Sequence, residues 1–257
     1  QGVSWLVHAN SRVLFGHYYA ILIFQGAAYG LLYGFEFVRL RFACWHFDFR
    51  IVMVIRSAAI AAILASHWIM VSVSVERLIS SIWPLQFEQC TRRFFGFFIG
   101  SSIIAISFVV TFYALSDGFR LFATTRNVLK MDLRIKDNKE AYDLTFQVMA
   151  YTYVPSSLIF AADCYLNFFK KRKQNITGSL AISYQYAENR KVISIILPLE
   201  ITNATVTIFG TIAQAVYNAV NPDATEIQRS LFVELTALSS LFPLAFAIII
   251  EWRVGYR

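Results

Sequence analysis

Charged side chains set within long apolar runs are the residues of this sequence that could do chemistry. A charge is costly in a lipid bilayer, so such groups pair with one another, reach for the interface, or line the path of a ligand or ion. Glu76 and Arg77 directly follow the apolar run 51–75 and could form an ion pair where that run meets water. Four further charges interrupt apolar runs: Arg56, Asp163, Glu200 and Glu234.

The sequence offers little that would support enzyme catalysis. Its histidines are scattered, at His8, His17, His46 and His67, and it contains neither a cluster of metal-ligating residues nor a glycine-rich phosphate loop. Metal sites and phosphate sites both need such local groupings. We therefore expect no metal, no cofactor and no enzymatic activity.

The composition is that of a membrane protein. Apolar residues make up 57% of the chain and charged residues 15%, against roughly 45–50% and about 25% in soluble domains. The apolar residues come in six long blocks that do not alternate with polar ones, as the strands of a membrane β-barrel would. The sequence thus predicts an all-α membrane protein, with residues 1–257 forming a single transmembrane helical bundle.

Six membrane spans are predicted from these blocks. The third holds 23 uncharged residues, about 34 Å of helix, which is enough for a hydrocarbon core of about 30 Å. The last three each contain a proline, which is expected to kink the helix because it removes a backbone donor: these are Pro155, Pro198 and Pro243. The spans are 13–35, 51–75, 94–116, 147–169, 192–218 and 230–250.

A stripe of glycines in the first span predicts close helix packing. Small residues at four-residue spacing let a second helix approach closely. The stripe, Gly26, Gly30 and Gly34, is expected to face the small residues of the second span, which are Ala58, Ala62 and Ser66. A homodimer or heterodimer contact is left open.

The distribution of basic residues predicts the orientation. If Arg77 is placed in the cytoplasm and each span reverses direction, the inside segments hold twelve Lys or Arg and four acids, a net charge of +8. The outside segments then carry a net charge of +1. Cytoplasmic loops of membrane proteins are rich in Lys and Arg, so residues 170–190 are expected to be cytoplasmic and residues 117–146 extracellular. The net charge of +7 then reflects this bias, and nucleic-acid binding is not expected.

The stretch that ends the second span resembles a known receptor motif. Glu76-Arg77-Leu78 is followed by Ser81-Ile82 and Pro84-Leu85. It resembles the end of the third helix of rhodopsin-like G-protein-coupled receptors, which reads acidic-Arg-aromatic, Ala-Ile and Pro-Leu. The chain opens on Gln1 and both ends fall inside, so the resemblance implies a seven-helix bundle of which six helices are visible and the first is missing.

A second stretch resembles a narrower family. Residues 179–189, SLAISYQYAEN, are similar to the Leu-Ser-x-x-Tyr-Gln-x-x-Glu-Asn signature of nematode chemoreceptors of the Sra superfamily, especially its Sre branch. The matching residues are Leu180, Tyr184, Gln185, Glu188 and Asn189, with Ala181 where serine is usual. Phe87-Glu88 also matches that family's acidic residue after the Glu-Arg pair.

These resemblances imply a chemosensory receptor of the plasma membrane, such as that of a sensory cilium. It would bind an external small molecule and activate a heterotrimeric G protein. Residues expected at the G-protein face are Glu76, Arg77, Glu88, Tyr184, Gln185, Glu188, Asn189, Arg190 and Lys191. In the resting bundle, Glu76 is expected to hold the Arg77 guanidinium.

The ligand end is expected at Arg56 and Glu234. Arg56 lies 21 residues before Arg77, about 31 Å away along a straight helix. Glu234 has a comparable depth on a helix that faces Arg56 in rhodopsin-like bundles, so the two are expected to pair or to bind an oppositely charged ligand group. The alternative is a transporter or ligand-gated channel that uses the intramembrane charges.

Overall fold

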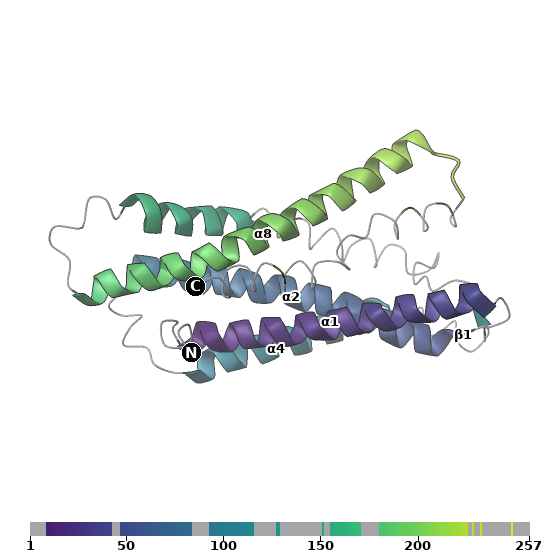
Figure 1. The fold of residues 1–257 in the computed structure, drawn as a ribbon, viewed down its shortest axis with the longest axis horizontal. Helices are drawn as coiled ribbons and strands as arrows, with labels where there is room; N and C mark the ends of the chain where they lie inside the picture. The colour runs from purple at the N-terminus through teal and green to yellow at the C-terminus, as the bar shows by residue number, and fades with distance from the viewer. Residues whose placement is uncertain are drawn as a thin grey trace.

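The computed structural model describes residues 9–42, 47–83, 93–115, 127–128, 151, 155–170, 180–225, 228, 232 and 248. Within these ranges the chain is almost entirely helical (Figure 1). The helices are α1 (Ala9–Phe42), α2 (Phe49–Ile82), α4 (Arg93–Ala114), a helix over 155–165 that ends in the π-helical turn η2 (Leu166–Lys170), and α8 (Leu180–Val220).

Three of these helices are long and apolar enough to cross a membrane, over Met53–Ile82, Phe95–Ala114 and Tyr186–Val220. They coincide with the second, third and fifth predicted spans. Helix α1 covers the first predicted span, 13–35, but is not one of the three. The predicted span 230–250, which includes Pro243, lies outside the described residues apart from isolated positions. The all-α membrane character is thus supported.

The helices run well beyond the predicted spans. Helices α1 and α2 have 34 residues each, about 51 Å against the roughly 30 Å of a hydrocarbon core. The segments between the first three predicted spans, 36–50 and 76–93, are therefore partly helical, since α1 continues to Phe42 and α2 runs from Phe49 to Ile82. Hydropathy predicts only the part of a helix that can face lipid. The helix itself can continue beyond that part where its polar side chains find partners.

Two short strands depart from a purely helical fold. Strands β1 (Phe47–Asp48) and β2 (Asn127–Val128) pair antiparallel, with Phe47 opposite Val128. The pairing joins the start of α2 to the segment 117–146, so the two segments predicted to be external meet at one end of the bundle. The opposite end gathers the starts of α1, α4 and α8 and the end of α2 (Figure 1).

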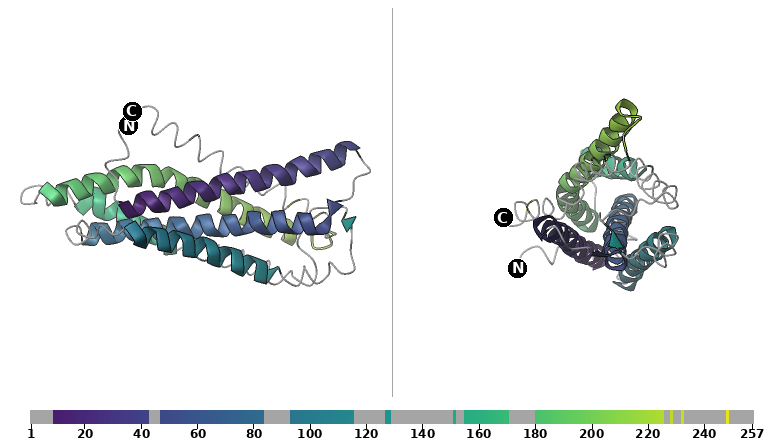
Figure 2. Two further views of the ribbon diagram at one scale, coloured as in Figure 1. Left: turned by 90° about the horizontal axis from the view of Figure 1, so that it is seen from below. Right: turned by 90° about the vertical axis from the view of Figure 1, so that its right-hand side faces the viewer.

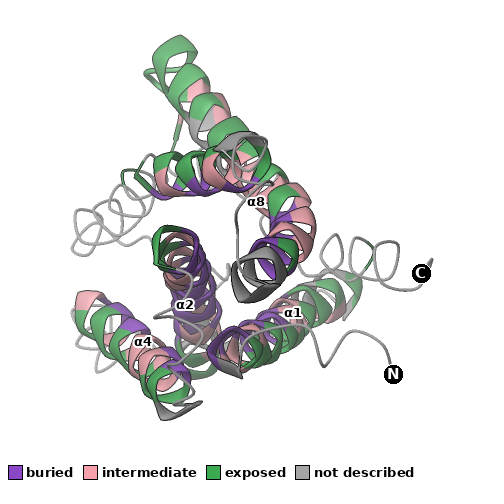
Figure 3. Cartoon of the chain, turned by 90° about the vertical axis from the view of Figure 1, so that its left-hand side faces the viewer, coloured by how far each residue is buried: buried purple, intermediate pink, exposed green. Residues whose placement is uncertain are grey.

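Helix α2 is the central element. Seen end-on, it lies between α1 and α4 on one side and α8 on the other (Figure 2), and it contacts all three. Its surface is mostly buried, whereas α4 and the far part of α8 are largely exposed (Figure 3). The main hydrophobic core joins α1, α2, Phe160 and the first half of α8, through residues such as Tyr18, Ile69 and Ile196. Exposed aromatics of α4, such as Phe98, are suited to contact lipid.

Two glycines of the predicted stripe, Gly30 and Gly34, do not pack against another helix. A Cβ atom built at either of them meets nothing within 4 Å. The prediction was wrong for these two because spacing alone does not fix which face of a helix turns inward. The face that is buried carries large residues instead, among them Leu14, Tyr18 and Leu22.

Close approach occurs instead between α4 and α1. A Cβ at Gly96 would lie 2.9 Å from the backbone oxygen of Asn10, and one at Gly100 would lie 2.8 Å from the His17 ring. The His17 imidazole lies against the same helix: its Nε2 is 3.3 Å from Ser101 Oγ, and its ring meets Phe97 edge-on.

Replacing Gly96 by alanine should destabilise the bundle by about 1–3 kcal/mol, because the clash is with backbone that cannot move aside. Gly100→Ala should cost less, since a side-chain ring can shift. Gly30→Ala is the matched control and should be neutral or stabilising by roughly 0.5–1 kcal/mol. Thermal unfolding of the three variants in lipid nanodiscs ranks their changes in stability. Equal losses for Gly96→Ala and Gly30→Ala would contradict the expected order.

Candidate functional site

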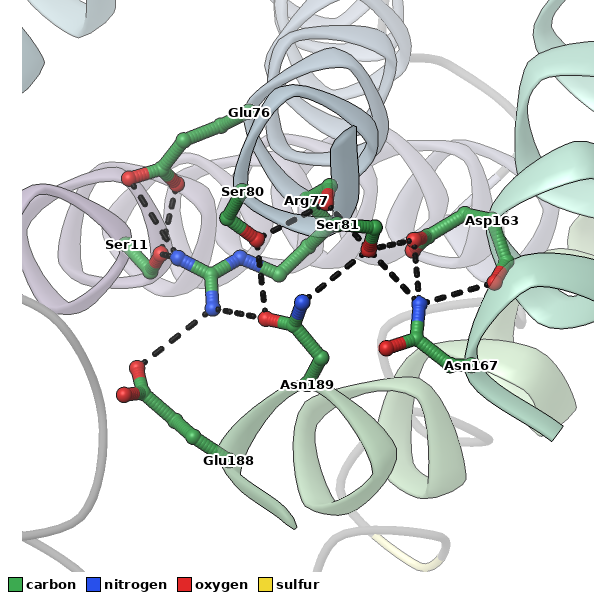
Figure 4. Close-up of polar contacts among 9 residues, drawn as sticks. All are labelled: Ser11, Glu76, Arg77, Ser80, Ser81, Asp163, Asn167, Glu188 and Asn189. Carbon is green, nitrogen blue, oxygen red and sulfur yellow. Dashed lines mark hydrogen bonds and ion pairs between the residues drawn. The ribbon is translucent and has the colours of Figure 1, made fainter. Parts of the chain in front are cut away.

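Arg77 is buried at the end of α2. Its exposure is 0%, and it is the largest fully buried side chain among the described residues. A buried guanidinium is stable only where its N–H groups find acceptors and its charge is balanced. Its two Nη groups find acceptors and its charge is balanced within a set of nine polar residues that includes Arg77, which we call the Arg77 network: Ser11, Glu76, Arg77, Ser80, Ser81, Asp163, Asn167, Glu188 and Asn189 (Figure 4).

The guanidinium connects α2 to α8 and α1. Its Nη1 donates to Asn189 Oδ1 at 2.9 Å and lies 3.4 Å from Glu188 Oε1, both on α8. Its Nη2 donates to Ser11 Oγ on α1 and lies 3.5 Å from Glu76 Oε1. The predicted contact with Glu76 is present, but Glu76 does not hold Arg77 alone. Adjacent residues on a helix point to different faces, so the closer bonds come from other helices.

Glu76 and Asn189 extend the network outward from Arg77. Ser11 Oγ donates to Glu76 Oε2 at 2.5 Å, which fixes the start of α1 to α2. Ser80 Oγ donates to Asn189 Oδ1 at 2.9 Å, and Asn189 Nδ2 donates to Ser81 Oγ at 3.0 Å. The Asn189 amide is completely buried. It therefore joins α8 to Arg77, Ser80 and Ser81, which lie within about one turn of α2.

Helix 155–165 and η2 supply the third side of the network. Ser81 Oγ lies 2.6 Å from Asp163 Oδ1 and 2.7 Å from Asn167 Nδ2. Asp163 and Asn167 are both 0% exposed. Four-residue spacing places them on one face of their helix. Four segments far apart in sequence thus meet at one end of the bundle.

The sequence pointed to part of this network. Glu76, Arg77, Glu188 and Asn189 were predicted as a site, and the structure brings all four together. Asp163 was noted only as an intramembrane charge. Ser11, Ser80, Ser81 and Asn167 were not predicted. The spacing of Ser80 and Ser81, three and four residues after Arg77, and of Asn167, four after Asp163, was the signal that could have found three of them.

The other predicted site residues lie away from the network or outside the described residues. Arg190 and Lys191 are half-buried on α8. Tyr184 and Gln185 belong to α8, but their side chains are outside the described residues, as are Glu88 and Glu234. Arg56 is half-buried on α2, so its predicted pairing with Glu234 stays a prediction.

The predicted proline kinks are likewise untested. Helix α8 continues through Pro198 without an interruption in its helical backbone, and Thr202 Oγ1 donates to the Pro198 carbonyl at 2.7 Å. Pro155 is the first residue described in helix 155–165.

The Arg77 network can hold the four helical segments together at this end of the bundle. Within the part of the chain that the structure describes, no group of three or more His, Cys, Asp or Glu side chains could hold a metal ion. Opening the network requires a set of buried polar groups to find new partners at once, which favours two discrete packings over a continuum. No known family model and no curated protein matches this chain.

Proposed function

We propose that this chain is a chemosensory G-protein-coupled receptor of the plasma membrane. It would be a seven-helix bundle, with six helices in this sequence, that binds an external small molecule and activates a heterotrimeric G protein. The observation that carries the proposal is the complete burial of Arg77 between α1, α2 and α8 at one end of the bundle. Burying a charge at the end of a long apolar helix is costly, and a costly buried contact suits a switch that opens during signalling.

The mechanism is a shift of population between two packings. In the packing described above, Glu188 and Asn189 hold the start of α8 against Arg77. Movement of the start of α8 away from α2 would break these contacts and expose the polar groups of both helices. The G protein would then bind the exposed surface, which extends over Glu76, Arg77, Arg190 and Lys191. A ligand shifts the population toward the open packing only to the extent that it binds the open packing more tightly than the closed one.

The ligand would bind at the opposite end, near Arg56. That residue lies 21 positions before Arg77 on the same helix, about 31 Å along its axis. The β1–β2 pairing covers this end of α2. A half-buried positive charge there suits a ligand with an acidic or strongly polar group, with Glu234 as the proposed partner of Arg56 when no ligand is bound.

A cell-based assay tests the proposal. Cells expressing the receptor should give a calcium or cAMP response to some members of an odorant panel, and the response should vanish when G-protein activation is blocked. Arg56→Gln should weaken the response to acidic odorants at unchanged surface expression, while Asp223→Asn, at an exposed turn, should not. A response that survives the G-protein block would contradict the proposal.

A transporter or ligand-gated channel is the second candidate. It is favoured by Asp163, which is 0% exposed in a predicted span, and by Glu200, which interrupts the apolar part of α8. Intramembrane acids often line transport pathways. Ligand-gated current in cells that lack the relevant G proteins would support this candidate.

A further inference from the structure

Ser81 Oγ makes more contacts of hydrogen-bond length than the donor hydrogens of the surrounding side chains can fill. Ser81 Oγ lies 2.8 Å from the Arg77 carbonyl oxygen and 2.6 Å from Asp163 Oδ1. The serine hydroxyl has a single hydrogen, and neither a carbonyl oxygen nor an ionised carboxylate has one to give. Only one of the two contacts can therefore be a hydrogen bond while Asp163 is ionised.

The neighbouring side-chain amides, Asn167 and Asn189, do not supply the missing hydrogens. Asn167 Nδ2 has two hydrogens but lies near three oxygens: Ser81 Oγ at 2.7 Å, the Asp163 carbonyl at 2.8 Å and Asp163 Oδ1 at 2.7 Å. Asn189 Nδ2 can give one hydrogen to Ser81 Oγ. These six close contacts therefore share at most four hydrogens.

The charge of the network is unbalanced in the same place. Its nine residues include three carboxylates and one guanidinium. Asp163 forms no ion pair with any described residue, and its Oδ2 is buried without a hydrogen-bond partner. Arg77 acts on it electrostatically, but the Arg77 Nη atoms contact Ser11, Glu76, Glu188 and Asn189. A buried carboxylate with one bare oxygen is costly to keep ionised.

We propose that Asp163 binds a proton in this packing and that release of the proton loosens helix 155–170 from α2 and α8. A hydrogen on Asp163 Oδ1 donates to Ser81 Oγ, which accepts a second hydrogen from Asn189 Nδ2 and gives its own to the Arg77 carbonyl. Asn167 Nδ2 then gives its two hydrogens to the Asp163 carbonyl and to Asp163 Oδ1. Oδ2 then becomes the carbonyl oxygen of a neutral acid, which is far less costly to bury unpaired than a charge. The network is thereby reduced to two carboxylates beside one guanidinium.

This regulation rests on the proposed function, because it makes the resting packing of the receptor sensitive to protons. The charged or titratable groups at this end of the elements around Asp163 include Glu76 and Arg77 on α2 and Tyr186, Glu188, Arg190 and Lys191 on α8. Cys164, Tyr165 and Lys170 follow Asp163 on its own helix. The packed bundle holds a proton that the separated helices release. Its stability must therefore fall as the pH rises through the range in which Asp163 ionises.

The test uses the chain in lipid nanodiscs without ligand or G protein. Thermal unfolding is followed from about pH 5.5 to about pH 8.5 for the wild type, Asp163→Asn and the exposed control Asp223→Asn. The wild type and the control should lose stability as the pH rises, by up to about tenfold per pH unit in the packed-to-unpacked ratio. Asp163→Asn mimics the neutral acid, so it should lose this slope and exceed the wild type at alkaline pH.

Infrared spectroscopy gives an independent readout of the proton. The wild type should show a carbonyl band of a protonated carboxyl group that Asp163→Asn lacks. Ser81→Ala removes the acceptor and should shift this band even if Asp163→Asn folds poorly. An unchanged pH slope in Asp163→Asn, or a band unaffected by both variants, overturns the proposal. Because neither measurement involves signalling, that result would leave the receptor function untouched, and a failed odorant assay would leave this proton site untouched.

Discussion

Arg77→Ala is expected to abolish G-protein activation and to destabilise the bundle by about 3–5 kcal/mol, the range measured when one partner of a buried charge pair is removed. The guanidinium donates to Asn189 and Ser11 and balances the Glu188 and Glu76 carboxylates. Its loss leaves these groups buried without their cation. The variant would therefore lose coupling and part of its surface expression together.

Two control variants show whether the effect of Arg77→Ala comes from the lost charge, from the lost hydrogen-bond geometry of the guanidinium, or from the loss of any basic residue. Arg77→Lys keeps the positive charge but loses the planar fork that reaches α1 and α8 at once, so it should show intermediate stability and weak coupling. Arg41→Ala removes an exposed arginine near the end of α1 and should change little. Signalling normalised to surface expression, with thermal unfolding of the purified proteins, measures both effects. Normal coupling by Arg77→Ala at the cell surface would reduce Arg77 to an interfacial anchor.

Asn189→Ala should have the opposite effect on signalling and raise basal activity. The amide accepts from Arg77 and Ser80 at 2.9 Å and donates to Ser81 at 3.0 Å. Losing these buried contacts between α2 and α8 should cost the resting packing about 2 kcal/mol, roughly a thirtyfold shift of the equilibrium toward the open packing. Basal signalling should rise until the open form saturates.

Glu188→Gln and Glu76→Gln provide graded comparisons for Asn189→Ala. Each removes one carboxylate charge near Arg77 while keeping the side-chain shape, so each should raise basal signalling by less than Asn189→Ala does. Asp223→Asn, at the far end of α8, is the matched control. Basal signalling is read without ligand, at equal surface expression. If Asn189→Ala signals no more than wild type under those conditions, the α2–α8 contact is structural and does not control activation.

The amino-acid sequence by itself predicted where the three helices lie that are long and apolar enough to cross a membrane. The apolar runs at 51–75, 94–116 and 192–218 all became helices, because a backbone in lipid must satisfy its own hydrogen bonds and only a long apolar helix does so locally. The same local information identified Glu76 and Arg77 as charges at the end of such a run. The lengths of the helices were underestimated, since α2 continues to Ile82 on polar contacts rather than on hydropathy.

Only the tertiary structure decided which residues meet. The Arg77 network joins positions 11, 77, 163 and 189, and no local pattern relates their spacing. The rotation of each helix about its axis is set by how large side chains such as Tyr18 and Ile196 pack, and this rotation turned Gly30 outward and Gly96 inward. It also placed Asp163 against Ser81, where the close contacts outnumber the hydrogens available to form hydrogen bonds. Hydropathy measures how much of a helix prefers lipid, whereas the facing of its polar residues is fixed only when neighbouring helices pack against it.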